Sequence, residues 1–300
     1  MIELKSVSKK FDHFQALDKI GSSISDSSIY GMVGSNGAGK STLLRILAGI
    51  YEVDEGEVLY DGQAIYNNPE VKKNVVLVGD ELYFFPGADL KRMAKFYASV
   101  YDNFDKDLFN ELIIDFKLDI NKNLGHYSKG MRRQAAIVLA LSTGANYLLF
   151  DETFDGLDPV VRKFVKKKIC EIVADKKATV IITSHSLREL EDICDHLVLL
   201  HKGSLVVDSD IIELKTHKFK VQIAFKEEFN RDKFSDFDIV SYSQRGSVAN
   251  IIINGEKEIV VNRLKGLNPV LLDVLPLTLE EIFIYEMEKL GYDFLEVTYE

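Results

Sequence analysis

The segment Gly34–Thr42 constrains the fold of this 300-residue chain more than any other, because it reads Gly-Ser-Asn-Gly-Ala-Gly-Lys-Ser-Thr and matches the pattern G-x-x-x-x-G-K-S in full. A short apolar run, Ile29–Val33, precedes it, and an amphipathic pattern over Lys40–Ala48 follows it. Loops of this kind connect a buried strand to a helix in parallel α/β sheets. We therefore predict a strand, a phosphate-binding loop and a helix in this order.

The residue types in this loop are those that a bound nucleotide needs. Glycine lets the backbone approach the phosphates, and successive N–H groups and the helix N-terminus then face them. We expect Lys40 to reach the β- and γ-phosphates and the Ser41 hydroxyl to ligate Mg²⁺. A Gly-rich turn that binds nothing is the alternative, but the strand–loop–helix context counts against it. The predicted nucleotide-binding residues are Gly34, Ser35, Asn36, Gly37, Ala38, Gly39, Lys40, Ser41 and Thr42.

A second motif is the apolar run Tyr147–Phe150, which ends in Asp151 and Glu152. Ligands of open parallel sheets bind at the carboxyl ends of the strands, where these side chains emerge. We predict that Asp151 holds Mg²⁺, directly or through water, and that Glu152 orients and deprotonates an attacking water. On its own, such a pair also fits an acidic helix cap; downstream of a phosphate loop, the catalytic interpretation is favoured.

Up to about residue 215, short apolar runs alternate with amphipathic stretches, which predicts an α/β fold with a largely parallel sheet. The predicted strands are Ile29–Val33, Val75–Val78, Tyr147–Phe150, Thr179–Thr183 and His196–His201. The predicted helices are Lys40–Ala48, Leu90–Tyr101, Asp107–Phe116, Lys129–Thr143, Val160–Ala174 and Ser186–Cys194.

The pattern changes near residue 215, where we place a domain boundary. Residues 216–300 are predicted to form a small α+β domain whose order, β-α-β-β-α-β and then a last helix, matches the ferredoxin-like arrangement. Its predicted strands are Phe219–Phe225, Asp238–Ser243, Val248–Ile253 and Pro269–Leu275. Its predicted helices are Glu227–Phe234, Glu256–Lys265 and Leu279–Leu290. We expect two domains, 1–215 and 216–300.

A third motif makes the chain similar to a known family. Residues Tyr127–Gln134 read Tyr-Ser-Lys-Gly-Met-Arg-Arg-Gln and resemble the signature motif of ATP-binding cassette (ABC) ATPases, whose common form is Leu-Ser-Gly-Gly-Gln. The segment Phe154–Pro159 resembles the D-loop region of the family, and His185 resembles its switch histidine. The resemblance covers about residues 1–215. It implies a P-loop NTPase fold of the ABC type, with a mixed, largely parallel sheet and additional antiparallel β and helical subdomains.

The resemblance also implies roles for individual residues. Two cassettes would pack head-to-tail around two ATP molecules, with the phosphate loop of one facing Ser128 and Gly130 of the other. Asp158 would reach across the dimer, and His185 would contact the γ-phosphate and help to position the attacking water. Phe11 stands where the family stacks an aromatic ring on adenine. The cofactors implied are ATP and Mg²⁺.

The chain departs from the family pattern in two places. The signature motif has Tyr127, Lys129 and Met131 where Leu, Gly and Gln are commonest, but it keeps the two residues that touch phosphate. Asp80 stands where a Gln of the family's Q-loop ligates Mg²⁺ and senses the membrane subunit. A carboxylate can still ligate Mg²⁺, so we predict Asp80 as a metal ligand beside Ser41 and Asp151, with an unusually steep Mg²⁺ dependence.

Each of two apolar segments allows two interpretations. Leu82–Phe85 is either packed in the core or a docking surface for the coupling helix of a membrane subunit. Leu277–Phe283 resembles the closing segment of many drug- and lipid-exporting cassettes, or is an ordinary amphipathic helix.

The leading interpretation of function is the ATP-hydrolysing subunit of a membrane ABC transporter, and of an exporter rather than an importer. No stretch approaches the about 20 apolar residues that a membrane span needs, and the N-terminus lacks the pattern of a signal peptide. We therefore expect a cytoplasmic protein, peripheral on the inner face of the cell membrane. The expected partners are a separate permease subunit and a second cassette, identical or not.

Two other function classes fit less well. A soluble ABC ATPase that acts on ribosomes or nucleic acid is disfavoured by the single cassette and by a net charge of −10, because nucleic-acid binding needs an excess of basic side chains. A switch that senses ATP without hydrolysing it would be expected if the acidic pair were degenerate. Asp151 and Glu152 are both present.

Overall fold

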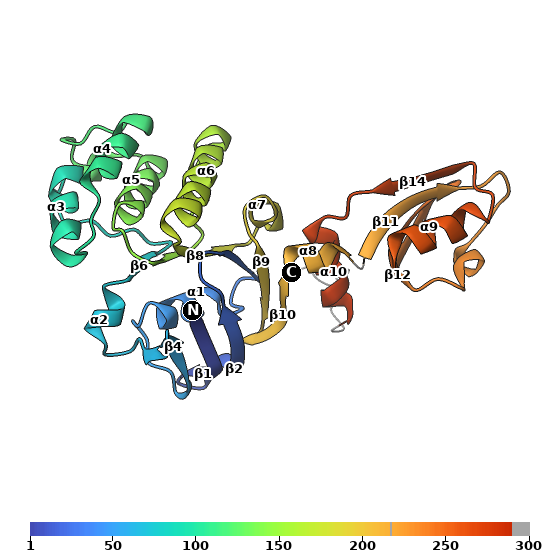
Figure 1. Ribbon diagram of the computed structural model, residues 1–300, viewed down its shortest axis with the longest axis horizontal. Coiled ribbons are helices and arrows are strands. Elements are labelled where there is room, and N and C mark those ends of the chain that lie inside the picture. The colour runs from blue at the N-terminus through green and yellow to red at the C-terminus, as the bar shows by residue number, and fades with distance from the viewer. Residues whose placement is uncertain (217, 290–300) are drawn as a thin grey trace. The chain divides into compact units, whose positions relative to one another are not determined.

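The computed structural model describes residues 1–216 and 218–289 and divides into two compact units, Met1–Asp208 and Ser209–Glu300 (Figure 1). The division precedes the short helix α8 (Ile211–Thr216), whereas the boundary predicted near residue 215 falls in the last turn of this helix. Each unit has its own hydrophobic core.

A six-stranded sheet forms the centre of the first unit, with the strand order β10-β9-β3-β8-β7-β6. The pairs β6/β7, β7/β8, β8/β3 and β3/β9 are parallel. Every residue of β3, β7 and β8 is buried, which explains why these strands read as continuous apolar runs. The predicted parallel α/β sheet is confirmed; β8 extends one residue beyond its prediction, and the edge strand β10 has no predicted counterpart. The strands are β3 (Ile29–Val33), β6 (Val75–Val78), β7 (Tyr147–Phe150), β8 (Thr179–Ser184), β9 (His196–His201) and β10 (Ser204–Asp210).

An antiparallel sheet with the order β2-β1-β4-β5 belongs to the same unit. No individual strands are predicted here from the sequence, although the resemblance implies an antiparallel part. Buried side chains of β1 and β2 share one core with α1 and with β3, β7 and β8 of the central sheet. The strands are β1 (Ile2–Phe11), β2 (Phe14–Ile24), β4 (Glu55–Tyr60) and β5 (Gln63–Ala64).

Several helices of the first unit begin at a polar side chain that caps the first turn, whereas α1 and α7 have no side-chain cap among the described residues. Asp89, Asp105 and Asp158 accept N–H hydrogen bonds at the starts of α3, α4 and α6. In Figure 1, α3, α4 and α5 gather into one group, which is the helical part that the resemblance implied. The α-helices are α1 (Lys40–Leu47), α2 (Pro69–Lys72), α3 (Leu90–Val100), α4 (Lys106–Asp115), α5 (Lys129–Leu141), α6 (Pro159–Lys176) and α7 (Leu187–Glu191), and Leu124–His126 forms a 3₁₀ turn.

The second unit contains a four-stranded antiparallel sheet with the order β12-β13-β11-β14. This is the ferredoxin-like strand order, but the first helix is reduced to a 3₁₀ turn over Arg231–Phe234. Asn230 caps that turn, and Phe234 at its end is fully buried in the core. Leu290, the predicted end of the last helix, lies outside the described residues. The elements are β11 (Lys218–Ala224), β12 (Ile239–Arg245), β13 (Val248–Asn254), α9 (Lys257–Lys265), β14 (Leu271–Leu275) and α10 (Leu279–Lys289).

A search of the described helices for a membrane span finds none that is both long enough and apolar enough to cross a bilayer.

Candidate functional site

The loop between β3 and α1 requires glycine at two of its positions. Gly39 has a φ of 107°, and a Cβ atom there would lie 2.7 Å from the carbonyl oxygen of Ala16. A Cβ atom on Gly34 would lie 2.4 Å from the carbonyl oxygen of Leu200. No side chain among the described residues caps α1. The first N–H groups of this helix are therefore left for the loop and for what the loop binds, as in other anion sites at helix N-termini.

Lys40 connects the loop to the acidic end of β7. Its side chain is only 7% exposed, and its Nζ donates hydrogen bonds to the carbonyl oxygens of Gly34 (2.7 Å) and Ser35 (3.3 Å). The same Nζ lies 3.7 Å from Oε1 of Glu152. A buried ammonium group needs such partners, and these fix it at the mouth of the loop.

A cavity of about 290 Å³ lies beside the loop, lined by residues 36–42 and by side chains from elsewhere in the chain. Asp80 and Glu152 line it, so the structure brings two of the three predicted acids to the phosphate loop, while Asp151 is not among the described residues that line the cavity. The Ser41 hydroxyl and these carboxylates are hard oxygen donors, the kind that Mg²⁺ prefers. The residues present therefore fit a magnesium ion bound together with a nucleotide phosphate.

The two acids at the end of β7 share one hydroxyl group. Thr183, at the end of β8, donates from Oγ1 to Oδ1 of Asp151 at 2.7 Å and accepts from the backbone N–H of Glu152 at 3.0 Å. Asp151 is 3% exposed, and Thr183 is fully buried. Thr183 is not among the site residues predicted from the sequence. The sequence does contain a signal for this residue: Thr183 is polar and lies at the carboxyl end of a fully buried strand. The neighbouring strand β7 is followed by the two acids.

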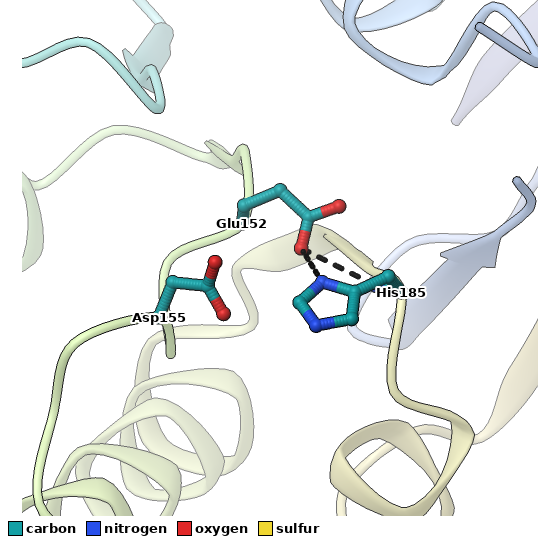
Figure 2. Close-up of side chains that lie close together, drawn as sticks. All are labelled: Glu152, Asp155 and His185. Carbon is teal, nitrogen blue, oxygen red and sulfur yellow. Dashed lines mark hydrogen bonds and ion pairs between the residues drawn. The ribbon is translucent and has the colours of Figure 1, made fainter. Parts of the chain in front are cut away.

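Glu152 and His185 form a hydrogen-bonded pair, shown in Figure 2. Oε2 of Glu152 lies 3.0 Å from Nδ1 of His185 and accepts from its backbone N–H at 3.2 Å. The hydrogen bond to Glu152 raises the pKa of His185, since a carboxylate favours the protonated ring. The backbone of Glu152 is left-handed, with a φ of 47°, which is uncommon for a residue other than glycine. The structure therefore brings together the two predicted catalytic residues.

The turn that carries His185 is held by residues that we had not predicted. The Ser184 hydroxyl donates to Oε2 of Glu189 (2.9 Å) and accepts from the backbone N–H of Ser186 (3.0 Å). Oε1 of Glu189 in turn pairs with Arg162 of α6 at 2.7 Å. These contacts connect α6, α7 and the end of β8 around the histidine.

Asp80 has a partner that the sequence interpretation lacked. Arg133, in α5, is 1% exposed, and its guanidinium donates to Oδ1 of Asp80 (2.7 Å) and to the carbonyl oxygen of Gly79 (2.9 Å). Arg133 precedes the buried Ala136 and Ile137 by three and four residues, so it lies on the apolar face of its helix. A charged residue on such a face signals that a partner lies within reach of its charge. The carboxylate of Asp80 therefore lies between an arginine and the cavity.

Among the described residues, the aromatic ring that lines the cavity is Phe14, whereas the ring predicted to stack on adenine is Phe11. Phe14 lines the cavity and is 60% exposed. Phe11 pairs with it across the β1–β2 turn and packs edge-on against Tyr51, with the ring centroids 5.4 Å apart. Phe11 is not among the described residues that line the cavity. An aromatic residue directly across a two-residue turn was the available signal for Phe14.

Ser128, Gly130 and Asp158 are likewise outside the lining of this cavity, as far as the described residues show. Ser128 caps α5 by accepting from the N–H of Met131 (3.2 Å), and Asp158 caps α6 by accepting from two backbone N–H groups. A Cβ atom on Gly130 would lie 2.9 Å from the carbonyl oxygen of Gly156. One copy of the chain therefore does not bring these residues to its own phosphate loop.

The chain is similar to known proteins in sequence and in fold. A family model described as "ABC transporter" matches residues 17–155. The ABC transporter ATP-binding protein YtrB of Bacillus subtilis is 32% identical, over 95% of this chain and 97% of that protein. A probable sulfate/thiosulfate import ATP-binding protein, CysA of Chlorella vulgaris, is 28% identical over 72% of this chain and 94% of that protein. The dimeric structure of MJ0796, a bacterial ABC transporter cassette, superimposes with a TM-score of 0.65 at 19% identity, over 70% of this chain and 99% of that one.

Proposed function

Because this chain belongs to the family of ABC transporter ATP-binding proteins and is an ATPase of that family, we propose that it powers an exporter by driving a separate permease. The observation that carries the ATP-driven part of this proposal is the convergence of Lys40, Ser41 and Glu152 on one cavity, with His185 hydrogen-bonded to Glu152. We place the protein at the inner face of the cell membrane, held there by the permease.

The residues around the cavity have separate roles in the proposed hydrolysis. The loop N–H groups and Lys40 bind the phosphates and counter the charge that develops as the terminal phosphate leaves. Glu152 takes a proton from the attacking water, and His185, held through its Nδ1 and its backbone N–H, presents its other ring nitrogen to the γ-phosphate. Mg²⁺, when bound through Ser41, Asp151 and Asp80, would neutralise phosphate charge.

A second cassette completes the site in this proposal. Ser128 and Asp158 are exposed in one copy and lie outside the lining of its own cavity. Head-to-tail packing would bring Ser128 and Gly130 to the γ-phosphate that the other copy holds. The N-terminus of α5 suits this role, because helix N-termini attract anions. The MJ0796 cassette, of similar fold, is described as dimeric.

The permease would dock at the surface segment Leu82–Phe85. Tyr83 is 75% exposed, which is unusual for a ring that belongs to a core. A groove of about 330 Å³ includes this tyrosine and its neighbours Leu82 and Phe84. Phe85 extends the apolar surface by packing edge-on against Phe96, with the ring centroids 4.9 Å apart. The docking interpretation of this segment is therefore favoured over core packing.

The direction of transport rests on the resemblance of Leu277–Phe283 to exporting cassettes. Leu277, Leu279 and Ile282 are buried, so this segment also serves as an ordinary packed helix start. Relatives that are named for import are similar to the cassette as well. Uptake by inside-out vesicles that hold the permease and this chain, driven by external ATP, would support export; uptake by right-side-out vesicles with internal ATP would contradict it.

The substitution Glu152→Gln tests the catalytic assignment. The amide keeps the shape of the side chain but cannot accept the proton of water, so turnover should fall by at least about 100-fold while ATP binding remains. An ATP-bound dimer should then accumulate and be visible by size exclusion. Glu52→Gln, a change of the same type at an exposed residue, should leave turnover and dimer content as they were. Normal turnover in Glu152→Gln would refute the role of the carboxylate.

A further inference from the structure

Glu152, Asp155 and His185 form a cluster of possible metal donors at the edge of the site. One donor atom from each side chain lies within 4.8 Å of the other two, and Figure 2 shows the three groups facing one another. Glu152 follows β7, Asp155 lies in the loop behind it, and His185 follows β8. The side chain of His185 is 58% exposed, so an ion from solvent can reach the cluster.

We propose that this cluster binds Zn²⁺ and that the ion inhibits the ATPase. An imidazole nitrogen with two carboxylate oxygens is a donor set that Zn²⁺ accepts with a water as the fourth ligand. Zinc–ligand bonds of about 2.0–2.1 Å in tetrahedral geometry place neighbouring donors about 3.3 Å apart. The atoms Oε2 of Glu152 and Nδ1 of His185 are already 3.0 Å apart. Only Asp155 has to move closer.

The charges and contacts around the cluster support a dication there. Two carboxylates balance the charge of Zn²⁺ when the imidazole is neutral. Glu152 would use Oε2 for the ion while its Oε1 stays near Lys40, from which it lies 3.7 Å away. Within the described part of the chain, the carboxylate of Asp155 makes no hydrogen bond or ion pair, so it can turn toward the ion.

The same donor set separates this site from the magnesium site. Mg²⁺ prefers oxygen ligands in octahedral geometry, whereas imidazole favours Zn²⁺ and similar transition metals. The cluster therefore selects a different ion from the one that Ser41, Asp80 and Asp151 would hold. The inhibition rests on the proposed function: Zn²⁺ would occupy Oε2 of Glu152 and the Nδ1 through which Glu152 holds the His185 ring, and would so break the pair that hydrolysis needs.

Calorimetric titration of the full chain with Zn²⁺, without nucleotide, tests the binding site. We expect one saturable site that Asp155→Asn weakens by at least about tenfold, since loss of a direct ligand should cost no less than loss of an outer-shell partner. Asp175→Asn, which alters an exposed acid at the end of α6, is the matched control and should leave the affinity unchanged. Cys170→Ser should also leave it unchanged, which excludes the exposed thiol. Equal Zn²⁺ affinity in the wild type and Asp155→Asn would overturn the site.

Two further measurements separate this inference from the proposed function. Co²⁺ bound in place of Zn²⁺ should give visible absorption typical of low coordination in the wild type, and His185→Ala should remove it. The second measurement is an ATPase assay with excess Mg²⁺, in which each protein is compared with its own rate without Zn²⁺. The Zn²⁺ concentration that inhibits the wild type should be at least about tenfold lower than the one that inhibits Asp155→Asn. Site-dependent binding without any ATPase activity would contradict the proposed function alone. Binding without inhibition would contradict the inhibitory role.

Discussion

The hydroxyl of Thr183 fixes the relation between the two acids on which the chemistry depends. It donates to Asp151 and accepts from the N–H of Glu152, so both residues are held by one side chain of the neighbouring strand. Asp151 is 3% exposed, and loss of this donor would leave a buried carboxylate oxygen without it, at a cost of about 1–3 kcal/mol. Catalytic residues of this kind act through their positions, and here a residue that takes no part in the reaction sets those positions.

The hydrogen bond to Glu152 predicts how His185 titrates. The pKa of His185 in the folded chain lies above its ordinary value of 6.5, so the pairing adds stability that is fully present below that value and is lost as the pH rises through the raised pKa. In an NMR titration, Glu152→Gln should lower the pKa of His185 toward 6.5, because the amide attracts the charged ring less. Glu52→Gln should leave the titration as it is. Identical His185 titrations in the wild type and Glu152→Gln would disprove the coupling.

The two aromatic rings at the β1–β2 turn are expected to contribute differently to the binding of adenine. Phe14 lines the cavity, so Phe14→Ala should weaken ATP binding by at least about fivefold, which is the lower end of what stacking of one base contributes. Phe11→Ala removes a ring that packs on Tyr51 and should have a smaller effect. Equilibrium binding of ATP to both variants decides between them. A larger loss in Phe11→Ala would favour the position that the family resemblance implied.

At the scale of elements, α5 connects the two ends of the site. Its first turn carries Ser128 and Gly130, and its next residues bind the segment after β6: Arg133 holds Asp80 and Gly79, while Arg132 donates to the carbonyl oxygen of Leu82 at 3.2 Å. Arg132 also lies over the ring of Phe84, with its guanidinium carbon 5.7 Å from the centroid. The segment proposed to meet the permease is therefore attached to the helix proposed to meet the neighbour's nucleotide.

The Asp80–Arg133 pair bears on the predicted Mg²⁺ dependence. Asp80 lines the cavity while it pairs with Arg133, so Mg²⁺ at this carboxylate competes with a fixed positive charge. The dependence of the ATPase activity on the free Mg²⁺ concentration should be less steep in Asp80→Gln, because the amide interacts less strongly with both Mg²⁺ and Arg133. Glu81→Gln, at the exposed neighbouring acid, is the control and should keep the wild-type curve. An unchanged curve in Asp80→Gln would remove Asp80 from the metal site.

The elements that the sequence predicted well are those with local signals. β3, β6, β7 and β9 have the predicted bounds, because a strand buried on both faces reads as a short apolar run between breakers. The sequence predicts a longer helix, Glu227–Phe234, where the structure has the 3₁₀ turn Arg231–Phe234. The observed turn is shorter because it begins only after its cap at Asn230. The roles of Thr183 and Arg133 depend on contacts between elements far apart in the chain. No local pattern encodes those contacts, although each residue is a polar side chain at a buried position.

For the whole molecule, the exposed ring of Tyr83 is the feature that most directly tests assembly with a permease. Tyr83→Ala should reduce the amount of this chain that co-purifies with its membrane partner from detergent extract. Loss of a hot-spot ring from the interface corresponds to a fall of about 30-fold in the affinity for the partner. The ATPase activity of the isolated chain should persist, because Tyr83 does not line the cavity beside the phosphate loop. Tyr66→Ala, at another exposed tyrosine, is the control. Unaltered recovery of the partner with Tyr83→Ala would exclude this surface.

The close approach of Gly130 to Gly156 has a mechanical consequence for such an assembly. A single added methyl group on Gly130 would come within 2.9 Å of the Gly156 carbonyl oxygen, so the start of α5 and the loop before α6 approach too closely for a side chain at this position. These are the two segments that a neighbouring copy would meet. Any side chain at residue 130 would push these two segments apart, and would so change how one cassette meets the ATP held in the other.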